Sequence, residues 1–208
     1  MSSNSRRVQK ELMEIQRDFQ MSQDKQIYLK SLTSQLNFFI ARIKGPHLTP
    51  YETGRFFLKI QLQADYPISP PEVKFITHVW HPNIHPVQGS ICLDILADKW
   101  SPALSLRTTL LSIQALLSAP EPDDPLAINV GIQCKNNPEE FELTAKFWTY
   151  IYAKGQHQVY EYQEKLATLK SMGIQQILAL KILSSCHWNL EEAIETYKNL
   201  NLIHYVID

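Results

Sequence analysis

An alternation of apolar and mostly polar positions over residues 56–63 sets the strongest limit on the fold of this chain. Phe56, Leu58, Ile60 and Leu62 occupy every second position, and most positions between them are polar. A period of two is typical of a β-strand with one buried face. Similar strand signals lie at 36–43, before the turn-rich stretch 45–54, and at 73–80, after YPISPPE. Consecutive strands joined by short turns predict an antiparallel meander.

Helical periodicity flanks these strands on both sides. Residues 5–20 place apolar side chains on one face, and apolar residues recur with helical spacing from Leu106 to Leu117. Asn137 followed by Pro138 and two glutamates is typical of a helix start, with the asparagine as cap. Strands and helices in separate blocks predict an α+β fold.

A polar connection, AKGQHQ at 153–158, divides the chain. Three short helical patterns follow it, and Asn189 with Glu192 resembles a capping box at the start of the third. The predicted division is a core at 1–154, a linker at 155–159, a compact three-helix bundle at 160–200, and a tail at 201–208. The apolar tail, NLIHYVID, suggests no role.

Charge and cysteine usage narrow the function classes. Lys plus Arg is 20 and Asp plus Glu is 21, a balance that argues against nucleic-acid or membrane binding and favours protein partners. Cys92, Cys134 and Cys186 show neither metal-ligand spacing nor a disulfide pattern, so we expect no metal and a reducing compartment. With no apolar signal core at the N-terminus, we expect the cytoplasm or the nucleus.

Cys92 lies in a long irregular segment from His81 to about Ser105, and such segments tend to be functional. No lysine, arginine or histidine adjoins it in the sequence. A protease cysteine needs a neighbouring base to attack a stable amide, whereas a carrier cysteine accepts an acyl group already activated as a thioester. The segment therefore favours a carrier, with a buried structural cysteine as the alternative. Cys134 and Cys186, on helical patterns, are interpreted as structural.

Three motifs surround this cysteine in order: His81-Pro82-Asn83, Cys92-Leu93-Asp94 and Trp100-Ser101-Pro102. Together with YPISPPEVKF before them and EPDDPLAINVG after them, they resemble the signature of ubiquitin-conjugating enzymes over roughly residues 5–152. The resemblance implies a four-stranded antiparallel meander with flanking helices. It also implies an acyltransferase that carries ubiquitin as a thioester on Cys92 and passes it to a lysine of a substrate or of ubiquitin. No cofactor is implied, because a separate activating enzyme consumes the ATP.

The same resemblance implies roles for residues around Cys92. Asn83 would stabilise the oxyanion of the transfer step or order the site loop, and Asp124 would position or deprotonate the incoming lysine. A carboxylate beside an amine normally raises the pKa of that amine, which favours positioning and desolvation. His81 would form structural hydrogen bonds, and Leu93 and Asp94 would support the site. A turn-forming asparagine and an ordinary acidic turn are the alternatives for Asn83 and Asp124.

The implied partners are ubiquitin, its activating enzyme, ubiquitin ligases and protein substrates. Ile68 stands where many ligase-binding members have phenylalanine, and with Ser101, Pro102 and Ala103 it should form a ligase-facing patch. Arg6 and Arg7 belong either to this face or to an ordinary solvated surface. Thr53 replaces a usual glycine. The interval from Asn83 to Cys92 matches a subclass that carries a C-terminal ubiquitin-associated domain.

Residues 160–200 resemble that ubiquitin-associated domain, which binds an apolar patch on ubiquitin. Met172-Gly173-Ile174 matches its binding loop, although Ile174 is smaller than the usual aromatic residue and Lys198 stands where leucine is common. A docked, stabilising bundle is the alternative. Two further functions stay open, a conjugating enzyme for a ubiquitin-like modifier and a non-catalytic ubiquitin-binding scaffold. The combination of Cys92, Asn83 and Asp124 speaks against the scaffold.

Overall fold

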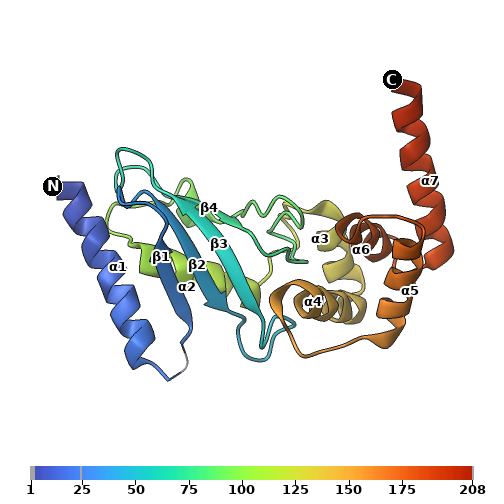
Figure 1. Cartoon of the computed structure of the whole chain (residues 1–208), viewed down its shortest axis with the longest axis horizontal. Helices are drawn as coiled ribbons and strands as arrows, with labels where there is room; N and C mark the ends of the chain where they lie inside the picture. Colours follow the sequence, from blue (N-terminus) through green and yellow to red (C-terminus); the bar gives the residue numbers. More distant parts are fainter. Residues whose placement is uncertain (1–2, 24, 208) are drawn as a thin grey trace.

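The computed structural model describes the backbone of residues 3–23 and 25–207 and the side chains of residues 5–23 and 25–200. A helix precedes a four-stranded sheet of order β1-β2-β3-β4, in which each neighbouring pair is antiparallel (Figure 1). These elements are α1 (Ser3–Met21), β1 (Ile27–Ser31), β2 (Phe38–Lys44), β3 (Arg55–Gln61) and β4 (Glu72–Phe75). The predicted meander is therefore confirmed.

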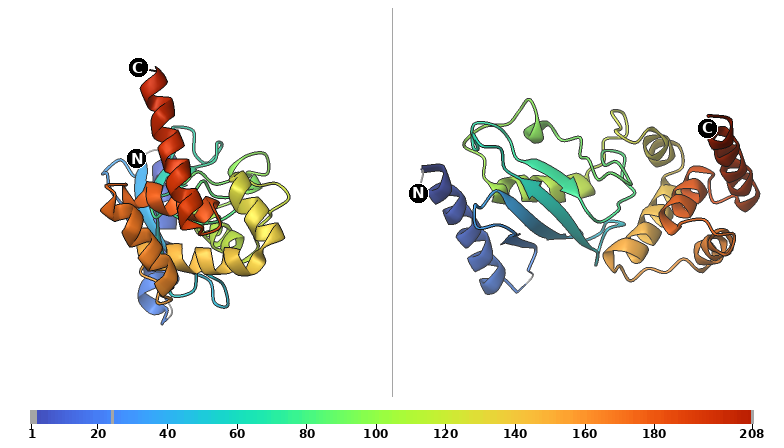
Figure 2. Two further views of the ribbon diagram at one scale, coloured as in Figure 1. Left: turned by 90° about the vertical axis from the view of Figure 1, so that its right-hand side faces the viewer. Right: turned by 45° about the horizontal axis from the view of Figure 1, so that its top comes forward.

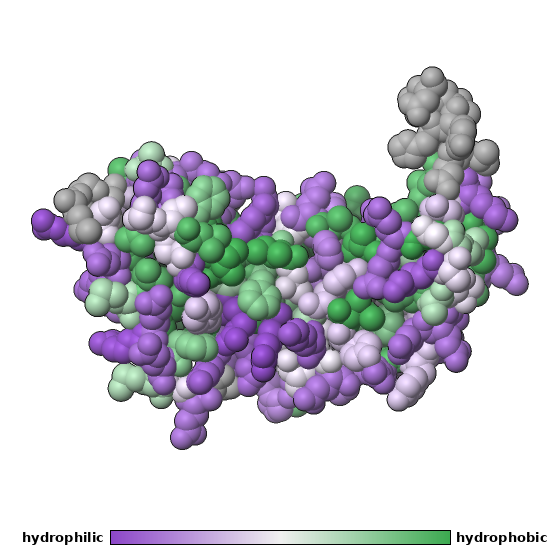
Figure 3. Space-filling model, in the orientation of Figure 1, coloured by the Kyte–Doolittle hydropathy of each residue, from purple (hydrophilic) through white to green (hydrophobic). Residues whose placement is uncertain are grey.

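The alternation in β3 determines how the sheet packs. Leu58 pairs with Ala41 on β2 and with Phe75 on β4, so three apolar side chains lie in one row across the buried face. That face is covered by α2 (Leu106–Ser118), whose Leu110 and Ile113 are fully buried. The opposite face meets solvent, and Figure 3 shows apolar residues gathering over β3 and β4 on that side.

Strand β4 ends at Phe75, so the predicted strand over 73–80 is too long. The backbone N–H groups of Ile76 and Thr77 both reach the carbonyl oxygen of Phe57, and the Thr77 hydroxyl accepts a hydrogen bond from the Phe57 N–H at 2.9 Å. A side chain thus takes the place of a backbone partner, and the ladder stops. The chain then turns inward and buries Val79 and Trp80.

The remaining elements are all helical and follow in chain order. A 3₁₀ turn, η1 (Asp94–Leu96), lies in the irregular segment, and α3 (Ile128–Asn136) precedes α4 (Pro138–Ala153). The predicted start of α4 is confirmed, because the Asn137 side chain accepts a hydrogen bond from the Glu140 N–H and Pro138 occupies the first turn. The C-terminal helices are α5 (Tyr160–Ser171), α6 (Gln176–Ser185) and α7 (Leu190–Ile207).

These C-terminal helices pack against α4. The indole N–H of Trp148 donates to the Ser184 hydroxyl at 2.9 Å, and that of Trp188 donates to the Thr144 hydroxyl at 2.8 Å. The Tyr162 ring stacks on Trp188 with centroids 3.6 Å apart. Docking of the bundle, one of the two sequence interpretations, is thus present, while the division at 154, 159 and 200 stays a prediction.

The last helix projects from the rest of the molecule (Figure 2). Its start matches the sequence pattern, since the backbone N–H groups of Glu191 and Glu192 donate to the Asn189 side chain at 3.1 and 3.2 Å. Its backbone stays helical to Ile207, and the side chains of 201–208 lie outside the described residues.

Candidate active site

Cys92 and Asn83 lie side by side although nine positions separate them. The backbone N–H of Cys92 donates to the carbonyl oxygen of Asn83 at 2.8 Å, next to an isolated antiparallel bridge between Ile84 and Ile91. The Cys92 side chain is exposed. A narrow two-stranded contact therefore presents the thiol to solvent at a fixed distance from the His81-Pro82-Asn83 motif.

The residues after Cys92 form the rim of this site. Leu93 is half-buried against the core, and Asp94 begins the 3₁₀ turn η1. The Asp94 carboxylate pairs with Lys99 at 2.7 Å, and its hydrogen bond with Lys99 holds the pKa of Asp94 below its usual value. Because Asp94 is paired within its own turn, it shapes the segment that follows the cysteine.

The Asn83 side chain is buried, with 3% of its surface exposed, and it binds the loop that contains Asp124. Its amide nitrogen donates to the carbonyl oxygens of Glu121 and Asp124 at 3.0 and 3.1 Å. Its amide oxygen accepts from the Glu121 N–H at 2.8 Å. Both amide hydrogens are thus engaged with backbone, which is the geometry of a residue that orders the loop rather than one that offers a free donor.

Asp124 is held near the cysteine through this same asparagine. Its carbonyl oxygen binds Asn83, and its carboxylate is on the exposed surface. The adjacent Asp123 pairs instead with Lys135 at 2.5 Å. A backbone hydrogen bond therefore joins Cys92 to Asn83, and the Asn83 side chain joins both to the backbone of Asp124, whereas Asp123 has a different partner.

His81 is fully buried beneath the site. Its Nε2–H donates to the carbonyl oxygen of Leu116 at 3.0 Å, and its Nδ1 accepts from the backbone N–H of Asn83 at 3.1 Å. Burial lowers the pKa of His81 from 6.5 to about 4, so the ring is neutral at physiological pH. With both nitrogens occupied, His81 fixes the start of Asn83 and has no nitrogen left for proton transfer.

This buried imidazole predicts an acid-dependent loss of stability. Since the folded-state pKa of His81 lies below its unfolded value, the unfolded state binds more protons between pH 6.5 and about 4, and stability falls as the pH is lowered through that range. The expected loss is about 3 kcal/mol in the free energy of unfolding. Urea denaturation at several pH values measures it.

His81→Gln removes the titrating group and should flatten this part of the pH dependence, even if the variant is less stable overall. His157→Gln, at an exposed position in the connection before α5, is the matched control and should keep the slope. A slope unchanged in His81→Gln would show that other groups cause the acid sensitivity.

The predicted ligase-facing residues lie on two loops that a hydrogen bond joins. Ile68 is 73% exposed, and Ser101, Pro102 and Ala103 are also exposed. The indole N–H of Trp100, just before the second loop, donates to the carbonyl oxygen of Pro67, just before Ile68, at 2.9 Å. The predicted patch is therefore contiguous.

Arg7 and the buried Glu11 join α1 to the same two loops. Arg7 donates to Glu11 at 2.8 Å and to the carbonyl oxygen of Leu104 at 2.8 Å. Its guanidinium therefore links α1 to the loop and is not a free surface cation. Glu11, 7% exposed, also accepts from the Tyr66 hydroxyl at 2.9 Å and from the Leu106 N–H at 2.8 Å. Glu11 was not among the predicted site residues, although a carboxylate on the apolar face of residues 5–20 was a signal.

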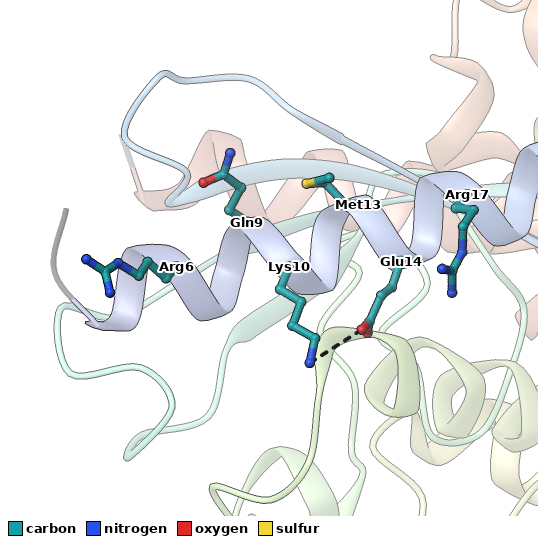
Figure 4. Close-up of a pocket in the computed structure, with 6 residues that line it drawn as sticks. All are labelled: Arg6, Gln9, Lys10, Met13, Glu14 and Arg17. Atoms are coloured by element: carbon teal, nitrogen blue, oxygen red, sulfur yellow. Dashed lines mark ion pairs between the residues drawn. The ribbon is translucent and has the colours of Figure 1, made fainter.

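Arg6 lies on the outer side of α1. There it lines a shallow hollow of about 570 Å³ with Met13, Arg17 and other residues of the same helix (Figure 4). Met13 is exposed, and Lys10 pairs with Glu14 at 3.9 Å. This face is mixed in character, with cationic side chains around an apolar one.

The predicted ubiquitin-binding loop is only partly accessible. Met172 is 45% exposed, and Gly173 takes a left-handed φ of 83° with open space around it. Ile174, in contrast, is 4% exposed and belongs to the core. Of the three residues, Met172 and Gly173 are thus the ones available to a partner.

Neither a metal-binding cluster nor a membrane-spanning helix is present among the described residues. No group of three or more histidine, cysteine, aspartate or glutamate side chains is placed to hold a metal ion in that part of the chain. Among the helices of the described ranges, none has both the length and the apolar character needed to cross a membrane.

Comparison with known proteins agrees with this geometry. Residues 7–149 match the ubiquitin-conjugating enzyme family. The chain is 45% identical to a Drosophila melanogaster ubiquitin-conjugating enzyme, E2-22 kDa, and 43% identical to human ubiquitin-conjugating enzyme E2 K, each alignment covering 91% of this chain and 94% of the relative.

Solved structures give the same answer for the fold. A putative ubiquitin-conjugating enzyme from Plasmodium yoelii aligns with a TM-score of 0.69 at 46% identity, over 75% of this chain and 99% of that one. The E2 domain of a Toxoplasma gondii ubiquitin-conjugating enzyme aligns with a TM-score of 0.66 at 43% identity, over 71% of this chain and 98% of that one. The chain therefore belongs to the ubiquitin-conjugating enzyme family and is a transferase that works through a thioester intermediate.

Proposed function

We propose that Cys92 carries the thioester and that Asn83 and Asp124 serve the transfer of ubiquitin to lysine. The observation that carries this proposal is the chain of contacts from the exposed Cys92, through the Asn83 backbone, to the loop held by the Asn83 side chain. In transfer, the lysine nitrogen attacks the thioester carbonyl carbon. A C–N bond forms, the C–S bond breaks, and the Cys92 thiolate leaves while the amine loses a proton to solvent.

The placement of Asp124 suits the approach of this lysine. An exposed carboxylate at the rim can attract and orient an ammonium group before it loses its proton. Asn83 supports the reaction by keeping the loop, and hence Asp124, at a constant distance from Cys92. The reaction uses no cofactor, since ATP is consumed by the separate activating enzyme.

The partner surfaces follow from exposure and position. Ile68 and the 101–103 loop present the ligase-facing patch, and the outer side of α1 with Arg6 extends it. The C-terminal bundle presents Met172 and Gly173, which support weak ubiquitin binding and growth of ubiquitin chains. Because Ile174 is buried, the contact surface would be small, and small apolar surfaces give low affinity.

A charging assay tests the function. The protein, an activating enzyme and ATP are incubated with ubiquitin or with each of several ubiquitin-like modifiers. We expect a reductant-sensitive adduct with ubiquitin and little or none with the other modifiers, each supplied with its own activating enzyme. Preferential charging with a ubiquitin-like modifier would overturn the proposed substrate, and a protein that charges with no modifier would be a non-catalytic scaffold.

A further inference from the structure

The residue just before the His81-Pro82-Asn83 motif is held in an unusually specific way. Trp80 is buried, and its indole N–H donates to the side-chain oxygen of Gln133 on α3 at 2.7 Å. Its ring packs against that of Trp148 on α4 with centroids 5.1 Å apart. The position of Trp80 fixes where the backbone enters the site, because His81 follows it directly.

Gln133 is also linked, through Glu140, to the C-terminal helices. It is buried, and its amide nitrogen donates to Oε1 of Glu140 on α4. The same oxygen accepts from Nδ1 of His187, at 2.9 Å, in the turn between α6 and α7. Trp80, Gln133, Glu140 and His187 therefore form one continuous chain of hydrogen bonds from the site to the bundle.

The hydrogen bonds through Gln133 form a first arm between Trp80 and the bundle, and contacts through Trp148 form a second arm. Trp148, which packs on Trp80, donates to the Ser184 hydroxyl on α6 at 2.9 Å. The two arms thus leave Trp80 through different residues and end on the same part of the bundle.

The turn that receives the first arm, directly after α6, has a strained backbone. His187 and Trp188 have left-handed φ values of 51° and 58°, a conformation that costs non-glycine residues free energy. The surrounding contacts must hold such a turn in place, and they include the hydrogen bonds of His187 to Glu140 and of Trp188 to Thr144.

We propose that Gln133 is a positioning residue for ubiquitin transfer, which couples the docked C-terminal helices to the segment carrying Asn83. A buried amide that loses one partner leaves that polar group unsatisfied, and Trp80 then shifts toward other partners. The Asn83 segment moves with it, and small displacements at a reacting centre slow the reaction strongly. The inference rests on the proposed function, since it assigns Asn83 a part in transfer.

Lysine discharge from the charged full-length enzyme provides the kinetic test. Gln133→Met should lower the maximal single-turnover rate about three- to tenfold, while loading and the lysine concentration at half-maximal rate stay unchanged. His187→Ala should slow discharge in the same direction. The double variant should be no slower than Gln133→Met alone, because the first substitution already cuts the arm. Glu195→Ala, exposed on α7, is the control and should match the parent.

A spectroscopic readout separates coupling from a general loss of structure. In ¹⁵N–¹H spectra of the uncharged protein, His187→Ala should shift the indole resonance of Trp80 and leave that of Trp100, bound to Pro67, in place. Because His187 is exposed, this variant should fold even if Gln133→Met does not.

The inference would be overturned if the Trp80 indole resonance did not move in His187→Ala. It would also be overturned if the double variant lost discharge rate by the product of the two single losses. If Asn83→Ala slows discharge and Gln133→Met does not, only the coupling falls. If Asn83→Ala also leaves discharge unchanged, the proposed role of Asn83 in transfer is wrong, whatever the role of Gln133.

Discussion

Cys92→Ser should convert the reductant-sensitive ubiquitin adduct into a reductant-resistant one, and Cys92→Ala should abolish the adduct. Serine places an oxygen where the sulfur stood, so the acyl bond becomes an ester that thiols do not exchange. Alanine offers no nucleophile at all. The measurement is electrophoresis of the charging reaction with and without reductant, and the expected loss in the alanine variant is complete.

Cys134→Ser is the matched control for this result. Cys134 is half-buried on α3, and burial raises the pKa of its thiol, which makes it a poorer nucleophile. This variant should charge like the parent protein. A Cys92→Ala protein that still formed a thioester would show that the nucleophile is another cysteine.

Asn83→Ala should leave loading of Cys92 nearly intact and slow discharge to lysine about a hundredfold or more. Loading exchanges one thioester for another and needs little help, whereas transfer depends on an ordered site that holds the attacking lysine in position. Without the Asn83 side chain, Glu121 and Asp124 lose the three hydrogen bonds that hold their loop. Single-turnover discharge over a range of lysine concentrations measures the effect.

Two further measurements tell loop ordering from direct catalysis. The Glu121 amide, which donates to Asn83, should exchange with solvent faster in Asn83→Ala if loop order is lost. Asn129→Ala, an exposed asparagine on α3, should change neither exchange nor discharge. Equal losses of loading and discharge in Asn83→Ala would indicate a damaged fold instead.

Elements with a strong local period were predictable, and those that depend on a neighbour were not. The alternation in β3 and the apolar face of α1 are visible in a window of a few residues. The residue patterns did not predict β1, because a strand of five residues with two buried side chains carries little signal. It is defined instead by its pairing with β2, as between Ile27 and Ile43. The end of β4 depends on the Thr77 side chain, which no strand pattern reveals.

The site shows the same division between local and distant information. Motif order around Cys92 singled out the residues, because such motifs are local. The partners of Asn83 lie 38 and 41 residues away in the sequence, so its loop-ordering geometry could be seen only in three dimensions. The docking of α5–α7 likewise depends on which indole meets which hydroxyl, as Trp148 does with Ser184.

The buried Glu11 carboxylate has a consequence for how partners would exchange on the proposed ligase-facing patch. It ties α1, the Tyr66 turn and the start of α2 into one unit, so the surface above it is shaped before any partner arrives. A preshaped surface spends little conformational entropy on association and can be docked as a rigid body. On the proposed ligase-facing patch, successive partners would then alternate without waiting for a loop to fold and unfold at each visit.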